Sequence, residues 1–159
     1  MVHLTTEDEL IKKALTSAKT IAIVGVSSIK KEISTDVKRR PSIIVMKYLQ
    51  EFGYRVVPVN PLAAGKKIYQ ETVFNKLEDI SIPIDIVNVF RPSSETPLIA
   101  AQAVKIGAKV LWLQYGIQNQ EAKEITETEN MFYVSNKCIK QEYQRLFLKI
   151  SPVFPALKK

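Results

Sequence analysis

Short apolar runs alternate with amphipathic segments along most of the chain. The first run, Thr20–Val24, is rich in β-branched residues and apolar at every position after Thr20, which is typical of a central strand buried on both faces of a parallel sheet. Similar runs recur later, and they predict strands at residues 54–59, 84–90, 109–113 and 131–134. Strands that alternate with helices in this way predict βαβ units joined by right-handed crossovers.

The segments between these strands have helical spacing. One predicted helix begins at Pro41 and ends before Gly53, because proline suits the first turn and glycine the C-terminal end. Its apolar positions follow the i, i+3, i+4, i+7 pattern of one helix face: Val45, Tyr48, Leu49 and Phe52. The other predicted helices span about residues 5–18, 95–106, 119–129 and 139–150. The first of them opens at a candidate capping box, formed by Thr5 or Thr6 with Asp8 or Glu9.

Residues 62–82 have a weaker pattern, which predicts a short strand near Lys67–Ile68 and a short helix near Phe74–Leu77. With this short strand counted as the third, we expect the order 3-2-1-4-5, or the same order with a sixth strand, and strands 1 and 4 adjacent. The expected fold class is α/β, a Rossmann-like doubly wound parallel sheet of five to six strands with helices on both faces. We expect one domain at residues 1–150 and a C-terminal tail at 151–159.

In such a sheet, ligands bind outside the C-terminal ends of the strands, where the strand order reverses. Three turns should meet there: the turn after the first strand, Gly25-Val26-Ser27-Ser28, the segment from Arg91 to Ser94, and the segment from Gln114 to Gly116. Arg91 leaves a buried strand directly at this crevice. It either contacts a ligand there or pairs with a neighbouring carboxylate at the surface.

The turn after the first strand predicts a phosphate site for a nucleotide-type cofactor. Gly25 permits a tight turn and close approach of a ligand, while Ser27 and Ser28 supply hydroxyls. The N-terminus of the following helix adds N–H donors and partial positive charge. The simpler alternative is that Gly25 only makes the turn.

The sequence argues against ordinary NAD binding. The G-x-G-x-x-G fingerprint is absent, because Gly25 is the only glycine of the turn. The end of the second strand carries Asn60-Pro61, where a carboxylate would hold the ribose hydroxyls.

Charge adds one feature to this picture. The 159-residue chain has a net charge of +7, and basic residues gather in the long loop 27–40 beside the predicted phosphate turn: Lys30, Lys31, Lys38, Arg39 and Arg40. These side chains either clamp phosphates or form a solvated charge run. Few aromatic residues interleave with them, which gives nucleic-acid binding little weight.

The candidates for catalysis and metal binding are few. The chain has a single cysteine, Cys138, and a single histidine, His3, so an intramolecular disulfide is excluded and a zinc site is disfavoured. We interpret Cys138 as a packed structural cysteine, Trp112 as a core residue, and the glutamates of segment 119–129 as solvated. The chain has no apolar run long enough to span a membrane and no signal-type segment, so we expect a cytoplasmic protein.

Several blocks resemble one family when they are taken together and in order. They are Ile23-Val24-Gly25-Val26-Ser27, Arg40-Pro41-Ser42, Val57-Pro58-Val59-Asn60-Pro61, Asn88-Val89-Phe90-Arg91-Pro92-Ser93, Trp112-Leu113-Gln114-Tyr115-Gly116 and Lys137-Cys138-Ile139. Over roughly residues 10–148 the chain resembles the CoA-binding domain family. Members of this family are small stand-alone proteins similar to the CoA-binding domain of the succinyl-CoA synthetase α subunit.

The resemblance implies that coenzyme A or an acyl-CoA binds across the strand ends. Carried over by position, Gly25, Val26 and Ser27 would line the pyrophosphate turn, and Arg40 and Ser42 would lie beside the phosphates. The remaining positions divide among three parts of the crevice: Asn60 and Pro61 at the adenosine end, Arg91 and Ser94 at its flanks, and Gln114 and Gly116 near the pantetheine path.

The chain departs from the family pattern at three places. Its loop before Arg40 is longer, Asn136-Lys137 stands where relatives often have Asp-Arg, and Ile139 stands where proline is common. If that acid takes part in a reaction in relatives, this chain lacks it.

The sequence therefore favours a carrier, sensor or accessory module that binds free CoA or a CoA thioester and has no catalysis of its own. One alternative is a small enzyme, or one subunit of a split synthetase, that acts on acyl-CoA. A weaker alternative is a redox sensor that binds NAD(H). A homodimer and a synthetase-type partner chain both remain open.

Overall fold

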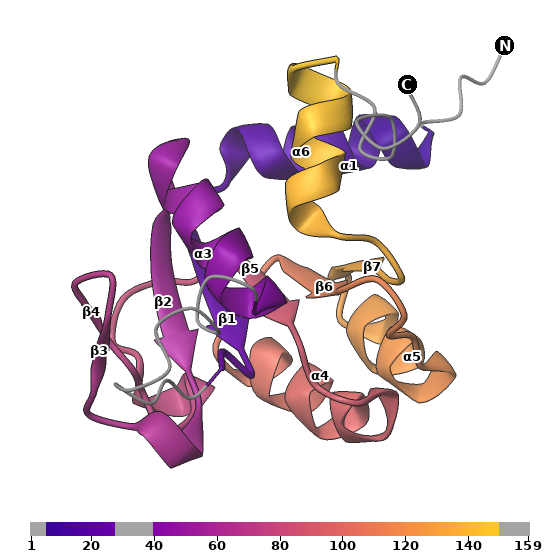
Figure 1. Ribbon diagram of the computed structural model, residues 1–159. Helices are drawn as coiled ribbons and strands as arrows, with labels where there is room; N and C mark the ends of the chain where they lie inside the picture. Colours follow the sequence, from indigo (N-terminus) through magenta and orange to yellow (C-terminus); the bar gives the residue numbers. More distant parts are fainter. Residues whose placement is uncertain (1–5, 28–39, 150–159) are drawn as a thin grey trace, which may run out of the picture.

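The computed structural model describes residues 6–27 and 40–149. Its main sheet contains five strands: β1 Thr20–Val24, β2 Arg55–Val59, β5 Ile86–Val89, β6 Val110–Leu113 and β7 Phe132–Val134. They are all parallel and lie in the order β2-β1-β5-β6-β7. Figure 1 shows this sheet between two groups of helices, which confirms the expected Rossmann-like α/β class.

Each face of the sheet is covered by its own group of helices. One group consists of α1 Glu7–Ser17, α3 Pro41–Glu51 and α6 Ile139–Phe147. The other consists of α4 Thr96–Lys105 and α5 Gln120–Thr128 (Figure 1). The predicted capping box begins α1, because the Thr6 hydroxyl accepts the Glu9 N–H at 3.1 Å and the Glu9 carboxylate accepts the Thr6 N–H at 2.9 Å.

The two faces explain why the central strands are apolar throughout. Successive side chains of a strand point to opposite faces. In β1, Ile21 and Ile23 therefore join the core under α1, α3 and α6, while Ala22 joins the core against α4. Trp112 is fully buried, as predicted, and its Nε1 donates a hydrogen bond to the Lys137 carbonyl at 2.8 Å.

The predicted third strand is not part of the main sheet. Strand β3 (Lys67–Ile68) instead pairs antiparallel with β4 (Glu71–Thr72) in a separate two-stranded sheet. The turn between them, Tyr69-Gln70, has φ values of 46° and 74°, the left-handed conformations of a tight hairpin, so the two short strands pair with each other.

The chain then returns to the main sheet at one residue. Phe74 forms a parallel bridge with Val59, and its N–H donates to the Pro58 carbonyl at 2.9 Å. The short helix expected near Phe74–Leu77 therefore starts later, as a 3₁₀ turn at Leu77–Asp79. In the predicted numbering the observed order is 2-1-4-5-6, and the expected adjacency of strands 1 and 4 is confirmed as β1 beside β5.

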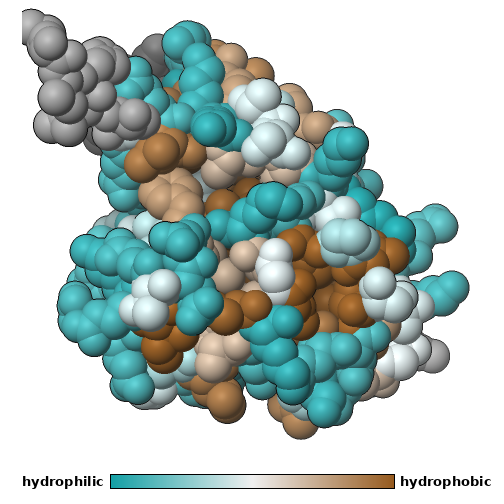
Figure 2. Space-filling model, turned by 180° about the vertical axis from the view of Figure 1, so that it is seen from behind, coloured by the Kyte–Doolittle hydropathy of each residue, from teal (hydrophilic) through white to brown (hydrophobic). Residues whose placement is uncertain are grey.

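The surface seen from behind is mainly hydrophilic, with a hydrophobic area on the side of β2 and the β3–β4 hairpin (Figure 2). None of the helices in the described part of the chain is both long and apolar enough to cross a membrane.

Candidate functional site

The turn after β1 touches the end of β5 at the point where the strand order reverses. Gly25 has a φ of +91°, and its N–H donates to the Val59 carbonyl at 2.9 Å. A Cβ at this position would lie 2.7 Å from the Phe90 carbonyl oxygen and 2.7 Å from Arg91 Cδ. Glycine is therefore required both by the backbone conformation and by the close approach of the two strand ends.

The same turn is held against the start of α3 by two serines. The Ser42 hydroxyl accepts the Ser27 N–H at 2.9 Å, and the two hydroxyl oxygens lie 3.1 Å apart. Ser42 is only 2% exposed, so its side chain positions the turn from beneath. Helix α3 begins at Pro41 and has no acidic residue in its first turn, which leaves the partial positive charge of its N-terminus uncompensated by its own carboxylates.

Asn60 joins the turn to the segment after β2. Its Nδ2 donates to the Val26 carbonyl at 2.6 Å, and its Oδ1 accepts the Leu62 N–H at 2.8 Å. The amide is used as donor and as acceptor, and an ionised aspartate could not make the first bond. This contact explains locally why an amide stands where dinucleotide sites carry an acid. Pro61 follows as the exposed first residue of a 3₁₀ turn.

Arg91 pairs with a carboxylate of its own loop. Its Nε and Nη2 donate to the two oxygens of Glu95 at 2.9 and 2.8 Å, which is the surface alternative considered from the sequence. Both side chains are nearly half exposed, so a ligand phosphate can still reach the guanidinium. The hydrogen bond from Arg91 lowers the pKa of the Glu95 carboxyl below its ordinary value. Ser94 is exposed in the 3₁₀ turn between these residues.

Two cavities open on this edge of the sheet. The first, of about 320 Å³, collects four of the predicted residues, Gly25, Asn60, Pro61 and Arg91, together with one face of α4. The second, of about 610 Å³, is lined by Pro41, Phe90, Gln114, Tyr115, Ile117, Cys138 and Gln141.

The end of β5 separates the two cavities. Phe90 lines the second and its neighbour Arg91 lines the first. Successive residues of an extended chain point to opposite sides, which accounts for this division. A ligand long enough to occupy both cavities must therefore cross the edge of the sheet at Gly25.

Gln114 is buried in the wall of the second cavity. Its Oε1 accepts hydrogen bonds from Asn88 Nδ2 and from the Ile139 N–H, both at 2.9 Å. Gly116 lies at the same edge, with a φ of +86°, and its N–H donates to Asn136 Oδ1 at 2.6 Å. An aspartate at position 136 would accept the same N–H, so the departure from the family pattern keeps this contact.

The structure thus brings most of the predicted residues to one edge but gives them different surroundings. Val26 is fully buried, Arg40 is the half-buried N-cap of α3, and Ser94 and Gly116 line neither cavity. Ser28 and the basic segment 28–39 lie outside the described residues, so the clamp hypothesis stays a prediction.

Sequence reasoning missed the contribution of α4 to the first cavity. Four lining residues occupy one face of this segment: Glu95, Leu98, Ile99 and Gln102. Their i, i+3, i+4, i+7 spacing is visible in the sequence, and Leu98 is an apolar residue with 67% of its surface exposed. The spacing alone predicts a buried face, and only the packing shows that this face borders a cavity.

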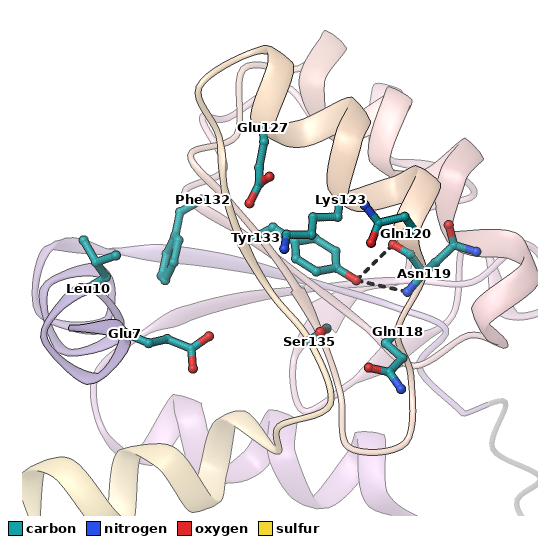
Figure 3. Close-up of a pocket in the computed structure, with 10 residues that line it drawn as sticks. All are labelled: Glu7, Leu10, Gln118, Asn119, Gln120, Lys123, Glu127, Phe132, Tyr133 and Ser135. Atoms are coloured by element: carbon teal, nitrogen blue, oxygen red, sulfur yellow. Dashed lines mark hydrogen bonds between the residues drawn. The ribbon is translucent and has the colours of Figure 1, made fainter. Parts of the chain in front are cut away.

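A third cavity, of about 660 Å³, lies between α1, the edge strand β7 and the start of α5 (Figure 3). Tyr133 crosses it, with its hydroxyl hydrogen-bonded to the backbone N–H and carbonyl of Asn119 at 3.0 and 3.1 Å. None of the predicted site residues lines this cavity, so it is distinct from the switch point.

Comparison with known proteins identifies the family of this chain. The family model for the CoA binding domain matches residues 19–144. The chain belongs to the CoA-binding domain family. It is 37% identical over 133 residues to the uncharacterized protein YneT of Bacillus subtilis (strain 168), which covers 82% of this chain and 89% of that protein.

Solved structures that are similar to this chain in sequence have the same fold. The structure of cell-free ID.343 from Thermus thermophilus has 32% identity and a TM-score of 0.80, and the match covers 89% of this chain and 100% of that one. A hypothetical protein from Pyrococcus horikoshii OT3 has 34% identity and a TM-score of 0.77, with 92% and 99% covered.

A more distant neighbour is a much longer chain. It is the dinucleotide-forming acetyl-coenzyme A synthetase 1 of Ca. Korarchaeum cryptofilum, with 19% identity and a TM-score of 0.58. The match covers 74% of this chain and 26% of that one, and it shows the shared fold alone.

Proposed function

We propose that this protein binds coenzyme A, free or as an acyl thioester, across the β1/β5 switch point and acts as a carrier, sensor or accessory module. The observation that carries this proposal is the contact of Gly25 with Phe90 and Arg91, because it divides a charged cavity from a nearly uncharged one. CoA has the matching form, with a phosphorylated adenosine at one end and a neutral arm at the other.

The first cavity would take the adenosine end. Its apolar wall includes Val59, Leu77 and Ile99, which suits a flat base, and Arg91 supplies a cation for a phosphate. The pyrophosphate would then lie over the Gly25–Ser27 turn at the N-terminus of α3, where N–H groups and the helix dipole favour negative charge. The arm would continue past Phe90 into the second cavity.

Binding without turnover is the simplest activity for these residues. The described residues contain no histidine, the carboxylates along α5 are exposed and line neither cavity, and Glu95 in the first cavity is paired with Arg91. We therefore propose no general acid–base pair at this edge.

Titration calorimetry and thermal unfolding with CoA, acetyl-CoA, NAD and ATP test the proposal. A ligand that binds only the folded state raises its melting temperature, so we expect CoA and acetyl-CoA to stabilise the protein and NAD to leave it unchanged. Adenosine 3′,5′-bisphosphate should bind more weakly than CoA, since it would fill the first cavity alone. Absence of binding by both CoA and acetyl-CoA would refute the proposal.

A further inference from the structure

The second cavity contains a hydrogen-bond donor that the fold itself does not use. Gln114 is only 5% exposed, and both hydrogen bonds to its side chain end on Oε1. Within the described residues its Nε2 has no hydrogen-bond partner, and it is not sealed from solvent as Asn88 Oδ1 is. Gln114 lines the cavity, and this amide nitrogen is the polar atom of its side chain that is left to serve a ligand there.

A free thiol lies in the same wall. Cys138 is half-buried, packs against the core on the α6 side of the sheet and lines the second cavity. It immediately precedes Ile139, whose N–H is held by Gln114 Oε1 at 2.9 Å. The Gln114 side chain is therefore tied to the residue that follows the thiol, and both residues line one cavity.

This pair fits the end of a pantetheine arm. The arm carries amide carbonyls, which accept hydrogen bonds, and it ends in sulfur. A carbonyl bonded to Gln114 Nε2 would satisfy the buried donor. β5 lies between β1 and β6, so the ends of β1 and β6 are two strand spacings apart, about 10 Å. An arm that starts at the Gly25 turn spans this distance.

We propose that Cys138 undergoes thiol–disulfide exchange with the disulfide form of coenzyme A and retains one CoA as a mixed disulfide. This inference rests on the proposed function, because it needs the arm to lie in the second cavity. The Cys138 thiolate attacks one sulfur of CoA disulfide, the sulfur–sulfur bond of the reagent breaks, and a bond from Sγ to that sulfur forms. The second CoA leaves as a thiolate and takes up the proton that Cys138 has lost.

Exchange suits this cavity better than acyl transfer does. Exchange requires an accessible thiol and a disulfide of suitable orientation. Acyl transfer would also need a general base, and the described residues that line this cavity include no histidine, carboxylate or lysine. CoA disulfide acts as the oxidant, so no further redox partner is needed.

The test is intact-mass spectrometry under non-reducing conditions. The reduced protein is incubated with CoA disulfide or with glutathione disulfide, and the rate of adduct formation is compared. Binding of the CoA moiety makes the exchange effectively intramolecular, so we expect the CoA adduct to form at least about tenfold faster. Cys138 is the only cysteine, so an adduct reports this site, and dithiothreitol should remove it.

Two variants test whether the preference for CoA disulfide comes from recognition of CoA or only from exposure of the Cys138 thiol. Gln114→Glu keeps an oxygen for Asn88 and Ile139 but removes the donor, and it should abolish the preference for CoA disulfide. The matched Gln118→Glu, whose exposed side chain lies in the third cavity, should keep the preference. The rate of alkylation by iodoacetamide checks that the thiol stays accessible in both variants.

Equal rates with the two disulfides, or no CoA adduct, would overturn the inference. Calorimetry of the reduced wild-type protein with CoA then tells the two failures apart. If CoA binds but no preferential adduct forms, the proposed function stands and the exchange is wrong. If CoA does not bind, both fall.

Discussion

The two cavities at the switch point differ in how many contacts join the residues of their walls. In the first, Gly25 touches Arg91, Arg91 pairs with Glu95, and Asn60 holds the turn through Val26. In the second, an exposed Tyr115 and a half-buried Cys138 surround one fixed amide, Gln114. A charged cavity with walls joined by hydrogen bonds, beside an uncharged cavity with more exposed walls, suits the proposed ligand, which has a phosphorylated head and a neutral tail.

The largest effect should come from a substitution of Gly25, which lies at the division between the two cavities. Gly25→Ala adds a Cβ against the Phe90 backbone and the Arg91 side chain and also strains a positive φ. We expect a loss of about 2–4 kcal/mol in the free energy of unfolding, measured by urea denaturation.

The matched control is Gly53→Ala. Gly53 has a similar φ of +97°, but a Cβ there would meet nothing within 4 Å. This variant should lose only the strain, about 1 kcal/mol. Equal losses of stability at both positions would show that Phe90 and Arg91 move aside for the added Cβ at little cost in free energy.

The next effect concerns the hydrogen bond from Asn60 to the Val26 carbonyl. Asn60→Asp removes the donor to the buried Val26 carbonyl and adds negative charge beside the proposed phosphate site. We expect a loss of about 1–2 kcal/mol in stability and of roughly tenfold in CoA affinity. Asn130→Asp, at an exposed asparagine that lines neither cavity, should change neither quantity by a measurable amount. Calorimetry on both variants checks the prediction, and an unchanged CoA affinity in Asn60→Asp would place the phosphates elsewhere.

Arg91 should affect binding more than folding. Its pair with Glu95 is nearly half exposed, and such pairs contribute only about 0–1 kcal/mol to stability. In Arg91→Ala we expect roughly tenfold weaker binding of both CoA and adenosine 3′,5′-bisphosphate, since a charge-assisted hydrogen bond is lost. A loss confined to CoA would mean that Arg91 faces the arm instead of the adenosine end.

A substitution of Tyr115 should weaken the binding of CoA alone, and it tests whether the arm lies in the second cavity. The side chain is 76% exposed, so Tyr115→Ala should leave stability within about 0.5 kcal/mol of the wild type. Affinity for CoA should fall a few-fold, while adenosine 3′,5′-bisphosphate should bind as before. Parallel losses for both ligands in calorimetry would contradict the separation of the two cavities.

The smallest effect is a pH dependence. Because Arg91 lowers the pKa of Glu95, the pair contributes stability above the ordinary glutamate pKa of about 4.3, and this contribution is lost as pH falls through the lower folded value. Glu95→Gln should therefore flatten the stability profile slightly below pH ~4.3. Melting curves at several pH values measure this change, and identical profiles for wild type and variant would exclude a role of the pair.

Much of the fold could be predicted because its signals are local. The run Thr20–Val24 is apolar at every position except its first, since both faces of the strand are buried, and Thr6 with Glu9 form a capping box within one turn. The turn at Gly25 was predicted for the same reason, because the glycine directly follows a buried strand.

The misassigned region shows where local signals fail. Lys67–Ile68 has the composition of a strand, but the sequence does not say which partner it pairs with. The left-handed turn at Tyr69-Gln70 is formed by residues that seldom adopt this conformation. Without a glycine or asparagine in the turn, the sequence does not predict the hairpin in which β3 pairs with β4.

The sequence by itself determined the strands, the helices that separate them and the turn at Gly25, because each depends on neighbours within a few residues. Only the tertiary structure decided that Arg91 pairs with Glu95 while its Cδ packs against Gly25, and that the Gln114 side-chain oxygen accepts hydrogen bonds from Asn88 and Ile139. These contacts join residues that lie four to 66 positions apart in the chain. Apart from the local Arg91–Glu95 pair, these contacts depend on how distant strand ends meet, which no local pattern encodes.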